Sequence, residues 1–302
     1  MTSPKILVVF KESSLTRFEK VRPLPSRTKL GNYWEVLNGS HQRHHATVTG
    51  VRNQLKRMKL KADFILRRMM GRKGFADGRY DLVVTIGGDG TILDASHAIR
   101  NIPILGVNSD PLRSVARFSG CDMESFPGVL ESFLLGRLKP VSVPRLELSL
   151  NGRKHPWPVL NDLLVTTLSP AGTSRYTLKV GNRTEEQMSS GVWISTAAGS
   201  TAANLSAGGR ILPPARKCFQ YVVREAYLPK FGRRSLIKGI LGGSAALDMV
   251  SFMRDGRLFL DGANHILPFV LGDHLKVRLS PHPLSILGFK ATKGRIPRKR
   301  ID

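Results

Sequence analysis

Residues 80–91 read Tyr-Asp-Leu-Val-Val-Thr-Ile-Gly-Gly-Asp-Gly-Thr, an apolar strand that runs into a glycine-rich turn. A helical stretch, 94–99, follows directly, and then come a short buried strand over 102–107 and a helix over 123–135. This alternation of strands and helices predicts an α/β amino-terminal domain over residues 1–138.

Upstream of the turn, Lys5–Phe10 reads as a first buried strand. Between the two strands, apolar residues from Val51 to Met69 recur at spacings of three and four, which predicts an amphipathic basic helix over 52–73. Residues 11–50 show no clear period, so we expect a loop and an irregular connection there.

The apolar residues are spaced differently in the second half of the chain. Short apolar runs are separated by Gly, Asn, Pro and Asp, which is typical of β-structure. These runs predict strands at 143–150, 159–167, 176–180, 192–196, 257–260 and 275–279. We therefore expect a β-rich carboxy-terminal domain over residues 139–290, followed by a basic tail over 291–302.

Composition limits the class of protein. The 302 residues include 41% hydrophobic and 7% aromatic residues, enough for a substantial core, so wholesale disorder is excluded. No apolar run approaches the roughly 18 residues of a membrane span, and we expect no membrane association. Two cysteines form neither a disulfide framework nor a zinc site by themselves, and the first residues lack a signal-peptide layout. These features predict a cytoplasmic location.

The net charge of +25 is unevenly distributed. Nine Lys or Arg residues fall between Arg52 and Lys73 against one acid, and six more lie between Lys290 and Arg300. The first cluster is either a solvated helix face or an electrostatic funnel for phosphates. The tail predicts only non-specific adhesion to nucleic acid.

The glycine-rich turn Gly87-Gly88-Asp89-Gly90-Thr91 is the first candidate site. Glycines at the carboxyl end of a strand let main-chain N–H groups approach phosphate oxygens. Asp89 would repel a phosphate unless it binds magnesium, accepts a hydrogen bond or acts as a base. A plain Gly-Asp-Gly turn is an equal alternative. The Walker and Rossmann glycine patterns are both missing, which disfavours ordinary hydride-transfer binding.

Two further stretches carry polar groups suited to a nucleotide. Asn161 and Asp162 stand at the head of an apolar strand, where an amide suits an adenine edge and a carboxylate suits a ribose diol, although a simple turn explains the pair equally well. Residues 189–209 are dominated by Ser, Thr, Ala and Gly, so a flat polar ligand could lie close to the main chain. Tight helix packing through small residues is the alternative for this stretch.

Taken in order, these stretches resemble the NAD kinase family. The resemblance runs from Gly-Gly-Asp-Gly-Thr through the Asn-Asp pair and Gly-Ser-Thr-Ala…Ser-Ala-Gly-Gly to Asp261-Gly262 and Leu271-Gly272-Asp273. Within the family, the plant-type NADH kinase branch is the most similar, through residues 108–111, 189–191, 196–203 and 223–225. The resemblance implies the NAD kinase fold: a Rossmann-like α/β domain followed by a β-sandwich-like domain, with the site in the crevice between them.

The resemblance also implies roles for single residues. Asp89 matches the family's proton acceptor, and Asn161 and Asp162 match the pair that binds the adenosine of the dinucleotide. The coenzyme-binding set that it implies is Gly87, Gly88, Gly90, Thr91, Asn161, Asp162, Ser190, Thr201, Ala202 and Ser206. Most members have Glu at 162, Asp at 190 and Tyr at 203, where this chain has Asp162, Ser190 and Ala203.

The implied activity is ATP-dependent phosphorylation of the 2′-hydroxyl of the adenosine ribose of NAD or NADH, giving NADP(H), with Mg²⁺ or another divalent cation accompanying ATP. No metal site formed by protein residues is expected. ATP or polyphosphate as donor stays open, and a homodimer is expected. We expect the loss of a carboxylate at Ser190 to favour neutral NADH. The alternatives are a lipid kinase with the same Gly-Gly-Asp-Gly turn, a basic nucleic-acid-binding protein, and an inert homologue.

Overall fold

The computed structural model describes residues 4–72, 78–227 and 235–289, and the chain divides into two compact units. The first unit comprises the described residues up to 141 together with 284–289, and the second comprises those from 142 to 283. Segment 284–289 thus lies in the first unit, although the sequence analysis placed it in the second domain. The basic tail lies outside the described residues. No described helix is both long enough and apolar enough to cross a membrane.

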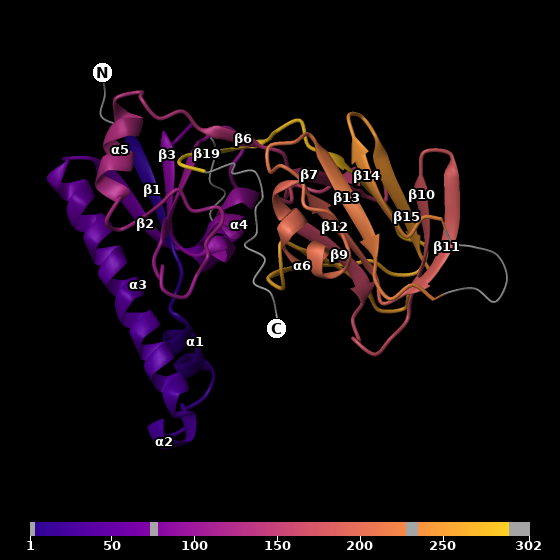
Figure 1. The fold of residues 1–302 in the computed structure, drawn as a ribbon, viewed down its shortest axis with the longest axis horizontal. Helices are drawn as coiled ribbons and strands as arrows, with labels where there is room; N and C mark the ends of the chain where they lie inside the picture. The colour runs from indigo at the N-terminus through magenta and orange to yellow at the C-terminus, as the bar shows by residue number, and fades with distance from the viewer. Residues whose placement is uncertain (1–3, 73–77, 228–234, 290–302) are drawn as a thin grey trace, which may run out of the picture. The chain divides into compact units, whose positions relative to one another are not determined.

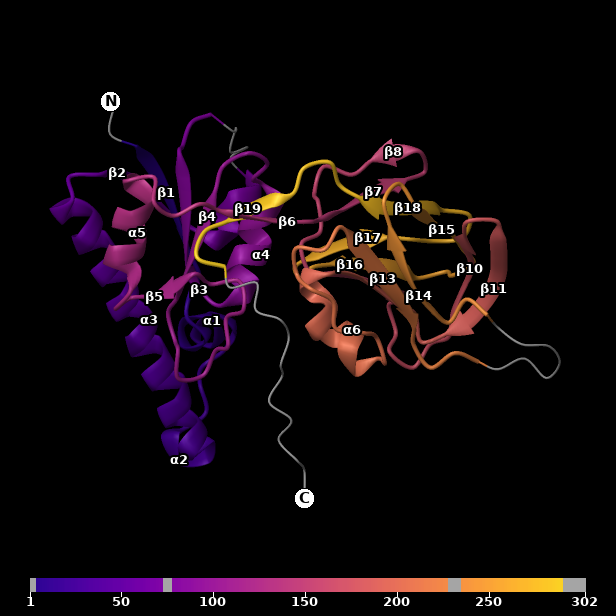
Figure 2. The same cartoon turned by 45° about the horizontal axis from the view of Figure 1, so that its top comes forward.

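The first unit is built on a seven-stranded sheet with the order β2-β1-β3-β4-β19-β6, and β5 pairs with β4 (Figures 1 and 2). The pairs β1–β2, β1–β3, β3–β4, β4–β5 and β4–β19 are all parallel. Its elements are β1 (Lys5–Phe10), α1 (Ser14–Val21), α2 (Arg27–Leu30), α3 (Asn32–Arg57), β2 (Lys61–Leu66), the 3-10 helix η1 (Arg67–Arg72), β3 (Leu82–Gly87), α4 (Asp89–His97), β4 (Ile104–Asn108), β5 (Cys121–Asp122), α5 (Phe126–Leu134), β6 (Val141–Val143) and β19 (Leu284–Ile286).

Helices cover both faces of this sheet. On one face, Val51 and Leu55 of α3 and Phe126 of α5 pack against strand residues such as Val8 and Val84. On the other face, Ile92 of α4 packs so closely on β4 that its Cδ1 lies 2.5 Å from where a Cβ on Gly106 would be. The predicted α/β architecture is confirmed, and burial on both faces explains why β1, β3 and β4 are almost wholly apolar.

The predicted helix over 52–73 is wrong beyond Arg57. The helix α3 ends there, and 61–66 forms the edge strand β2, in which Ala62 and Phe64 face the core while Lys61 and Asp63 are exposed. The chain turns at Lys59, whose φ of +55° is the left-handed conformation that Gly or Asn usually supplies after a helix. Because this position holds a lysine and not Gly or Asn, the sequence does not mark the end of the helix. The apolar residues of β2 therefore look like a continuation of the helical pattern.

The expectation of an irregular segment over 11–50 is also wrong. Helices α1 and α2 and most of the 26-residue α3 fill it, and α1 packs against α3. The buried face of α3 includes His44 and Thr47 beside Leu37 and Val51, so polar side chains hide its period. Helix α4 also begins at Asp89, five residues earlier than predicted, which places Asp89 and Gly90 in its first turn and Gly88 at its N-cap.

The second unit is a sandwich of two antiparallel six-stranded sheets. Their orders are β11-β10-β15-β18-β7-β8 and β14-β13-β12-β9-β16-β17 (Figure 2). The elements are β7 (Leu146–Leu150), β8 (Arg153–Lys154), β9 (Asp162–Thr167), β10 (Ser174–Val180), β11 (Arg183–Ser189), β12 (Val192–Thr196), the 3-10 helix η2 (Ala198–Thr201), α6 (Ala203–Ser206), β13 (Cys218–Val223), β14 (Lys238–Gly242), β15 (Ala246–Ser251), β16 (Gly256–Leu260), β17 (His265–Pro268) and β18 (His274–Leu279).

One core joins the two sheets of the sandwich. Leu163 and Ile194 from one sheet and Tyr176 and Val277 from the other belong to the same buried cluster. The predicted β-sandwich is therefore confirmed. In the second unit, the strands that the sequence missed are β8, β11, β13, β14, β15 and β17. Strand β13 is buried at every position, so it lacks the alternation that marks a strand with one solvent face.

The last described segment returns to the first unit. Strand β19 pairs with β4, and the turn after it lies against Gly120: a Cβ on Gly120 would be 2.2 Å from the carbonyl oxygen of Leu287. Gly288, with φ +67°, makes the reciprocal approach, because its own Cβ would be 2.8 Å from Gly120 Cα. Only glycine permits this contact between two main chains.

We expect Gly120→Ala to destabilise the protein by about 1–3 kcal/mol, because the added methyl must push the 287–288 main chain away. Gly128→Ala is the matched control. Nothing lies within 4 Å of its Cβ position in α5, so it should stabilise by about 0.5–1 kcal/mol. Urea unfolding of both variants measures the difference, and equal stabilities would contradict the close contact.

Candidate functional site

The glycine-rich turn joins β3 to α4. Gly87 ends the strand, Gly88 is the N-cap residue without a side-chain cap, and Asp89 begins the helix. The turn is tight, because a Cβ on Gly87 would lie 2.2 Å from Thr91 Oγ1 and a Cβ on Gly88 would lie 2.9 Å from Ser114 Oγ. The first N–H groups of α4 therefore meet no side-chain cap, which is the arrangement that binds anions at helix N-termini.

The carboxylate of Asp89 is held by main-chain amides. The N–H of Arg117 donates to Oδ2 at 3.0 Å, and the N–H of Phe118 donates to Oδ1 at 2.8 Å. Each oxygen keeps a further lone pair, so the carboxylate is oriented but can still accept a proton or a hydrogen bond. The sequence could not identify these two donors, since main-chain groups leave no trace in residue identity.

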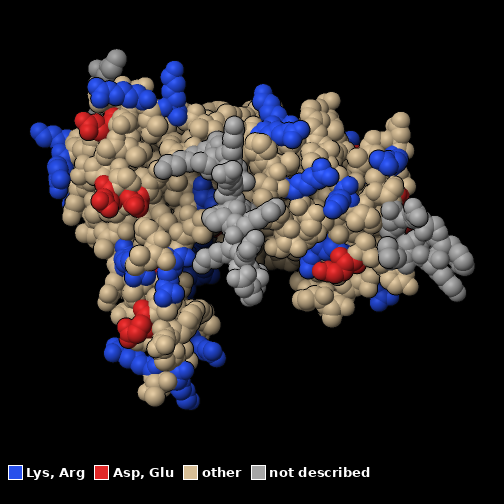
Figure 3. Space-filling model, in the orientation of Figure 1, with Lys and Arg blue, Asp and Glu red and all other residues tan. Residues whose placement is uncertain are grey.

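The guanidinium group of Arg67 lies beside the turn. Arg67 donates from Nη1 to the carbonyl oxygen of Gly90 at 3.3 Å, and its Nε forms an ion pair with Asp94 at 2.9 Å. In Figure 3, Lys and Arg side chains are spread over the visible face of both units with few acidic residues among them. The excess positive charge is thus distributed, and part of it lies beside the turn.

The second unit brings Asn161 and Asp162 into contact. Asn161 precedes β9 and donates from Nδ2 to Asp162 Oδ2 at 2.9 Å. The loop is fixed by Asp261, whose carboxylate accepts the N–H groups of Leu160, Asn161 and Asp162 at 2.9, 2.7 and 3.1 Å. This role of Asp261 could not be predicted, because its partners lie about a hundred residues away in the chain.

Asp162 is an unusual carboxyl group. It is only 6% exposed, and burial, followed by the nearby negative charge of Asp261, raises its pKa to about 7. At neutral pH a substantial fraction is therefore protonated. The group can then act as a hydrogen-bond donor as well as an acceptor toward a polar ligand.

The small-residue stretch lies against this loop. A Cβ on Gly199 would be 2.1 Å from the carbonyl oxygen of Asn161, and Thr196 donates from Oγ1 to the carbonyl of Leu160 at 2.7 Å. Thr201 ends η2, Ala202 links η2 to α6, and Ser206 ends α6. The structure therefore brings this stretch together with Asn161 and Asp162 within one unit. The stretch forms the end of β12, η2 and α6, and not one regular helix.

Ser190 lies elsewhere in the same unit. Its carbonyl accepts from Thr166 Oγ1 at 3.1 Å, which places it at the far end of β9 from Asp162. Four residues of strand correspond to about 13 Å. Gly191 follows with φ +111°, and a Cβ there would lie 2.3 Å from the carbonyl oxygen of Val165. Within one chain, Ser190 is thus not adjacent to the Asn-Asp pair.

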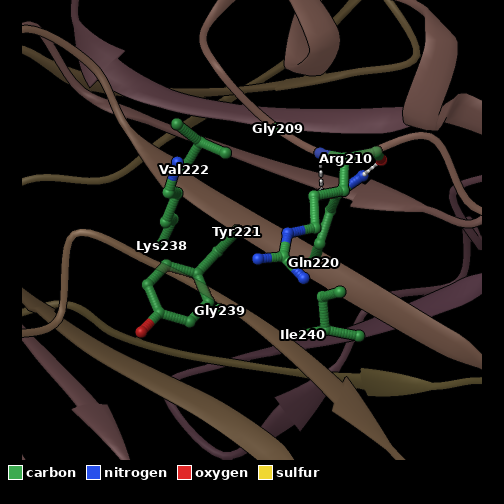
Figure 4. A pocket seen from close by; sticks show the side chains of 8 residues that line it. All are labelled: Gly209, Arg210, Gln220, Tyr221, Val222, Lys238, Gly239 and Ile240. Atoms are coloured by element: carbon green, nitrogen blue, oxygen red, sulfur yellow. Dashed lines mark hydrogen bonds between the residues drawn. The ribbon is translucent and has the colours of Figure 1, made fainter.

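A hollow of about 320 Å³ opens beside the end of the small-residue stretch (Figure 4). Gln220 holds the main chain of Arg210 at both polar groups, accepting its N–H at 2.9 Å and donating to its carbonyl at 2.7 Å. None of the site residues predicted from the sequence lines this hollow. The lining residues are Gly209, Arg210, Gln220, Tyr221, Val222, Lys238, Gly239 and Ile240.

The described residues contain no cluster of three or more His, Cys, Asp or Glu side chains that could hold a metal ion. Asp89 is the only carboxylate in the sequence Gly87–Thr91.

The sequence of the chain is similar to known kinases. Residues 29–137 match the family model described as ATP-NAD kinase N-terminal domain. The chain is 34% identical over 219 residues to a probable NADH kinase of Oryza sativa subsp. japonica, covering 65% of this chain and 67% of that one. It is 36% identical over 220 residues to the NADH kinase of Arabidopsis thaliana, covering 65% and 69%.

Solved structures share the fold. An NADH kinase from yeast, complexed with NADH, superposes with a TM-score of 0.70 at 18% identity, covering 97% of this chain and 85% of that one. An NAD kinase from Archaeoglobus fulgidus, in complex with ATP, gives a TM-score of 0.63 at 19% identity, covering 96% and 94%. Two-unit architectures of this kind thus occur in both proteins.

The raised pKa of Asp162 predicts a pH-dependent stability. The folded protein releases this proton near pH 7 and the unfolded chain near pH 4, so stability conferred by the protonated group is lost as pH rises between these values. Relative to Asp162→Asn, the wild type should lose up to about 4 kcal/mol from pH 4 to pH 7. Urea unfolding across this range measures it. Asp255→Asn, at an exposed position of the same unit, controls for charge removal. If the free energies of unfolding of the wild type and Asp162→Asn change equally with pH, the prediction is refuted.

Proposed function

The chain belongs to the NAD kinase family, and from this premise we propose that it transfers the γ-phosphoryl group of ATP to the 2′-hydroxyl of the adenosine ribose of NAD or NADH. The products are ADP and NADP or NADPH. One observation carries the proposal: the aspartate of the Gly-Gly-Asp-Gly turn is oriented by two main-chain amides at the start of a helix, beside glycines that leave phosphate oxygens free access.

Asp89 accepts the proton of the 2′-hydroxyl as that oxygen attacks the γ-phosphorus, and the bond from the γ-phosphorus to the β-γ bridging oxygen breaks. Its two amide hydrogen bonds fix the carboxylate before substrate binds, so little reorganisation is needed. The N–H groups at the start of α4 stabilise the charge on the transferring group. Positioning contributes more than proton abstraction in a loose phosphoryl-transfer transition state.

A divalent cation such as Mg²⁺, bound together with ATP, would neutralise part of the triphosphate charge. Lys and Arg side chains spread over the surface favour capture of the two polyanionic substrates. Polyphosphate offers the same anionic oxygens and stays the alternative donor.

The coenzyme is bound by the second unit. Asn161 can donate to and accept from the adenine edge, and Asp162 takes a ribose hydroxyl, with its carboxyl group able to serve as donor or acceptor near pH 7. The main chain of η2 and α6, around Thr201, Ala202 and Ser206, lies beside this pair and gives the coenzyme a surface with few side chains. The homodimer and the cytoplasmic location expected from the sequence stay predictions.

Neither the lipid kinase nor the nucleic-acid-binding protein gains support, and the activity assay below tests the third alternative, an inert homologue. A lipid kinase would need an apolar pocket at the turn, whereas the guanidinium group of Arg67 lies against Gly90 there. A nucleic-acid-binding protein would leave the amide-held Asp89 and the buried Asp162 without a role.

We expect Asp89→Asn to lose about 10²–10⁴-fold in kcat because asparagine accepts no proton at neutral pH. NADH binding, measured by its fluorescence, should be retained. The assay measures NADP(H) formed from NAD and from NADH, each with MgATP or polyphosphate. Thermal unfolding serves as the control for folding, since one amide of 117–118 loses its acceptor. A folded variant with wild-type turnover would show that Asp89 is not the proton acceptor.

Ser190→Asp should shift the ratio of kcat/KM toward positively charged NAD by up to about tenfold, because a partly solvated charge contact contributes about 1 kcal/mol. Thr184→Asp adds the same charge at an exposed position of the same strand region and is the control. An unchanged NADH/NAD ratio in Ser190→Asp would remove Ser190 from coenzyme selection.

A further inference from the structure

Three chain segments meet beside the glycine-rich turn, at one edge of the parallel sheet. Strand β3 is flanked by β1 and β4, so the residues that follow these strands, Lys11, Gly88 and Ser109, lie at the same edge. Ligands of such sheets bind beyond the carboxyl ends of the strands. The side chain of Lys11 reaches toward the turn, because its Cδ lies 3.6 Å from where a Cβ on Gly87 would be.

Lys11 is a cation without a matching anion. Its side chain is half-buried, and no carboxylate of the described residues lies at ion-pair distance from it. Asp110 attracts it from further away, but the two oxygens of Asp110 are engaged by Arg43 Nε at 2.7 Å and Ser40 Oγ at 2.5 Å. Burial lowers the pKa of Lys11, and the positive charges of Arg67 and Arg17 lower it further. An anion placed here would relieve both repulsion and desolvation.

His44 of α3 fixes the main chain of Lys11. Its Nε2 lies 2.8 Å from the carbonyl oxygen of Lys11 and its Nδ1 lies 3.0 Å from Ser109 Oγ. A carbonyl oxygen only accepts, so Nε2 carries the proton. Burial lowers the pKa of His44 to about 4, so the ring is neutral and Nδ1 accepts from the Ser109 hydroxyl. The network thus settles the tautomer and the direction of both hydrogen bonds.

The bridge made by His44 continues to the glycine-rich turn. The N–H of Ser109 donates to the carbonyl oxygen of Gly87 at 3.1 Å. Lys11, His44, Ser109 and Gly87 therefore form one hydrogen-bonded chain across the carboxyl ends of β1, β4 and β3. His44 is 2% exposed, and this burial leaves the imidazole little freedom to move.

We propose that Lys11 binds a phosphate group of the nucleoside triphosphate or polyphosphate donor, and that His44 is a positioning residue that holds Lys11 and Ser109 on either side of the Gly87–Gly88 turn. This assignment rests on the proposed function only for the identity of the donor. The ammonium group binds phosphate oxygens, while the N–H groups at the start of α4 approach them from the turn. Neither residue stood out in the sequence, since Lys11 is one of many cations and His44 lies in a segment without visible period.

The first experiment measures binding of MgATP and of inorganic tripolyphosphate by calorimetry. Lys11→Met should weaken both about 10- to 100-fold and leave NADH affinity unchanged. Lys56→Met, at an exposed position of α3, is the matched control and should bind like the wild type. Unchanged binding of both anions to Lys11→Met would overturn the proposal.

The outcomes separate this inference from the proposed function. A wild type that binds ATP through Lys11 but forms no NADP(H) would contradict the proposed function and support the phosphate site. A wild type that forms NADP(H) while Lys11→Met binds both anions normally would contradict the phosphate site alone.

The second experiment tests His44 through Lys11. His44→Leu should weaken ATP binding about 3- to 10-fold without changing NADH affinity, and His44→Gln should restore most of it because an amide can both donate and accept. Ser109→Ala removes the other end of the bridge if the leucine variant does not fold. In the Lys11→Met background, each change should have no further effect on ATP binding. Additive losses, or equal losses for ATP and NADH, would show that His44 only supports the fold.

Discussion

Carboxylates that accept main-chain amides hold both candidate parts of the site. In the first unit, Asp89 accepts two N–H groups of the 117–118 segment, and in the second unit, Asp261 accepts three N–H groups of the 160–162 loop. A hydrogen bond to a charged group contributes about 1.5–3 kcal/mol, more than a neutral one. The same kind of contact therefore fixes Asp89, the proposed base, in one unit and Asn161 and Asp162, the proposed coenzyme-binding pair, in the other.

The arrangement has an electrostatic counterpart. Asp89 stands among cations, since Arg67 contacts Gly90 and Lys11 approaches Gly87, whereas Asp162 stands beside a second carboxylate in a buried place. One environment suits ligands with several negative charges, and the other suits neutral hydroxyl and amide groups. This division agrees with a donor that is a polyanion and an acceptor whose reacting sugar is uncharged.

Where residue identity determines local structure, the sequence was sufficient. Strands β1 and β12 match their predicted ranges, and the glycine-rich turn lies at a strand–helix junction as expected. It failed where the deciding fact is a conformation or a distant partner. After α3, Lys59 adopts a conformation that is usual for glycine. The polar side chains of His44 and Thr47 interrupt the apolar pattern of a buried helix face. The main-chain amides that hold Asp89 cannot be recognised in the sequence. The family resemblance supplied the remaining roles, whereas Lys11 and the loop-holding role of Asp261 were found only from contacts in the structure.

The return of β19 to the first unit has a consequence for biosynthesis. The sheet of that unit needs residues 284–289, which leave the ribosome only after the whole sandwich has been translated. Vectorial folding from the amino terminus can therefore complete the sandwich before the Rossmann-like sheet, whose β4 edge must wait for its last neighbour. An excised fragment that stops at residue 138 would likewise lack this strand and would expose the apolar edge that Gly120 and Leu287 close in the intact chain.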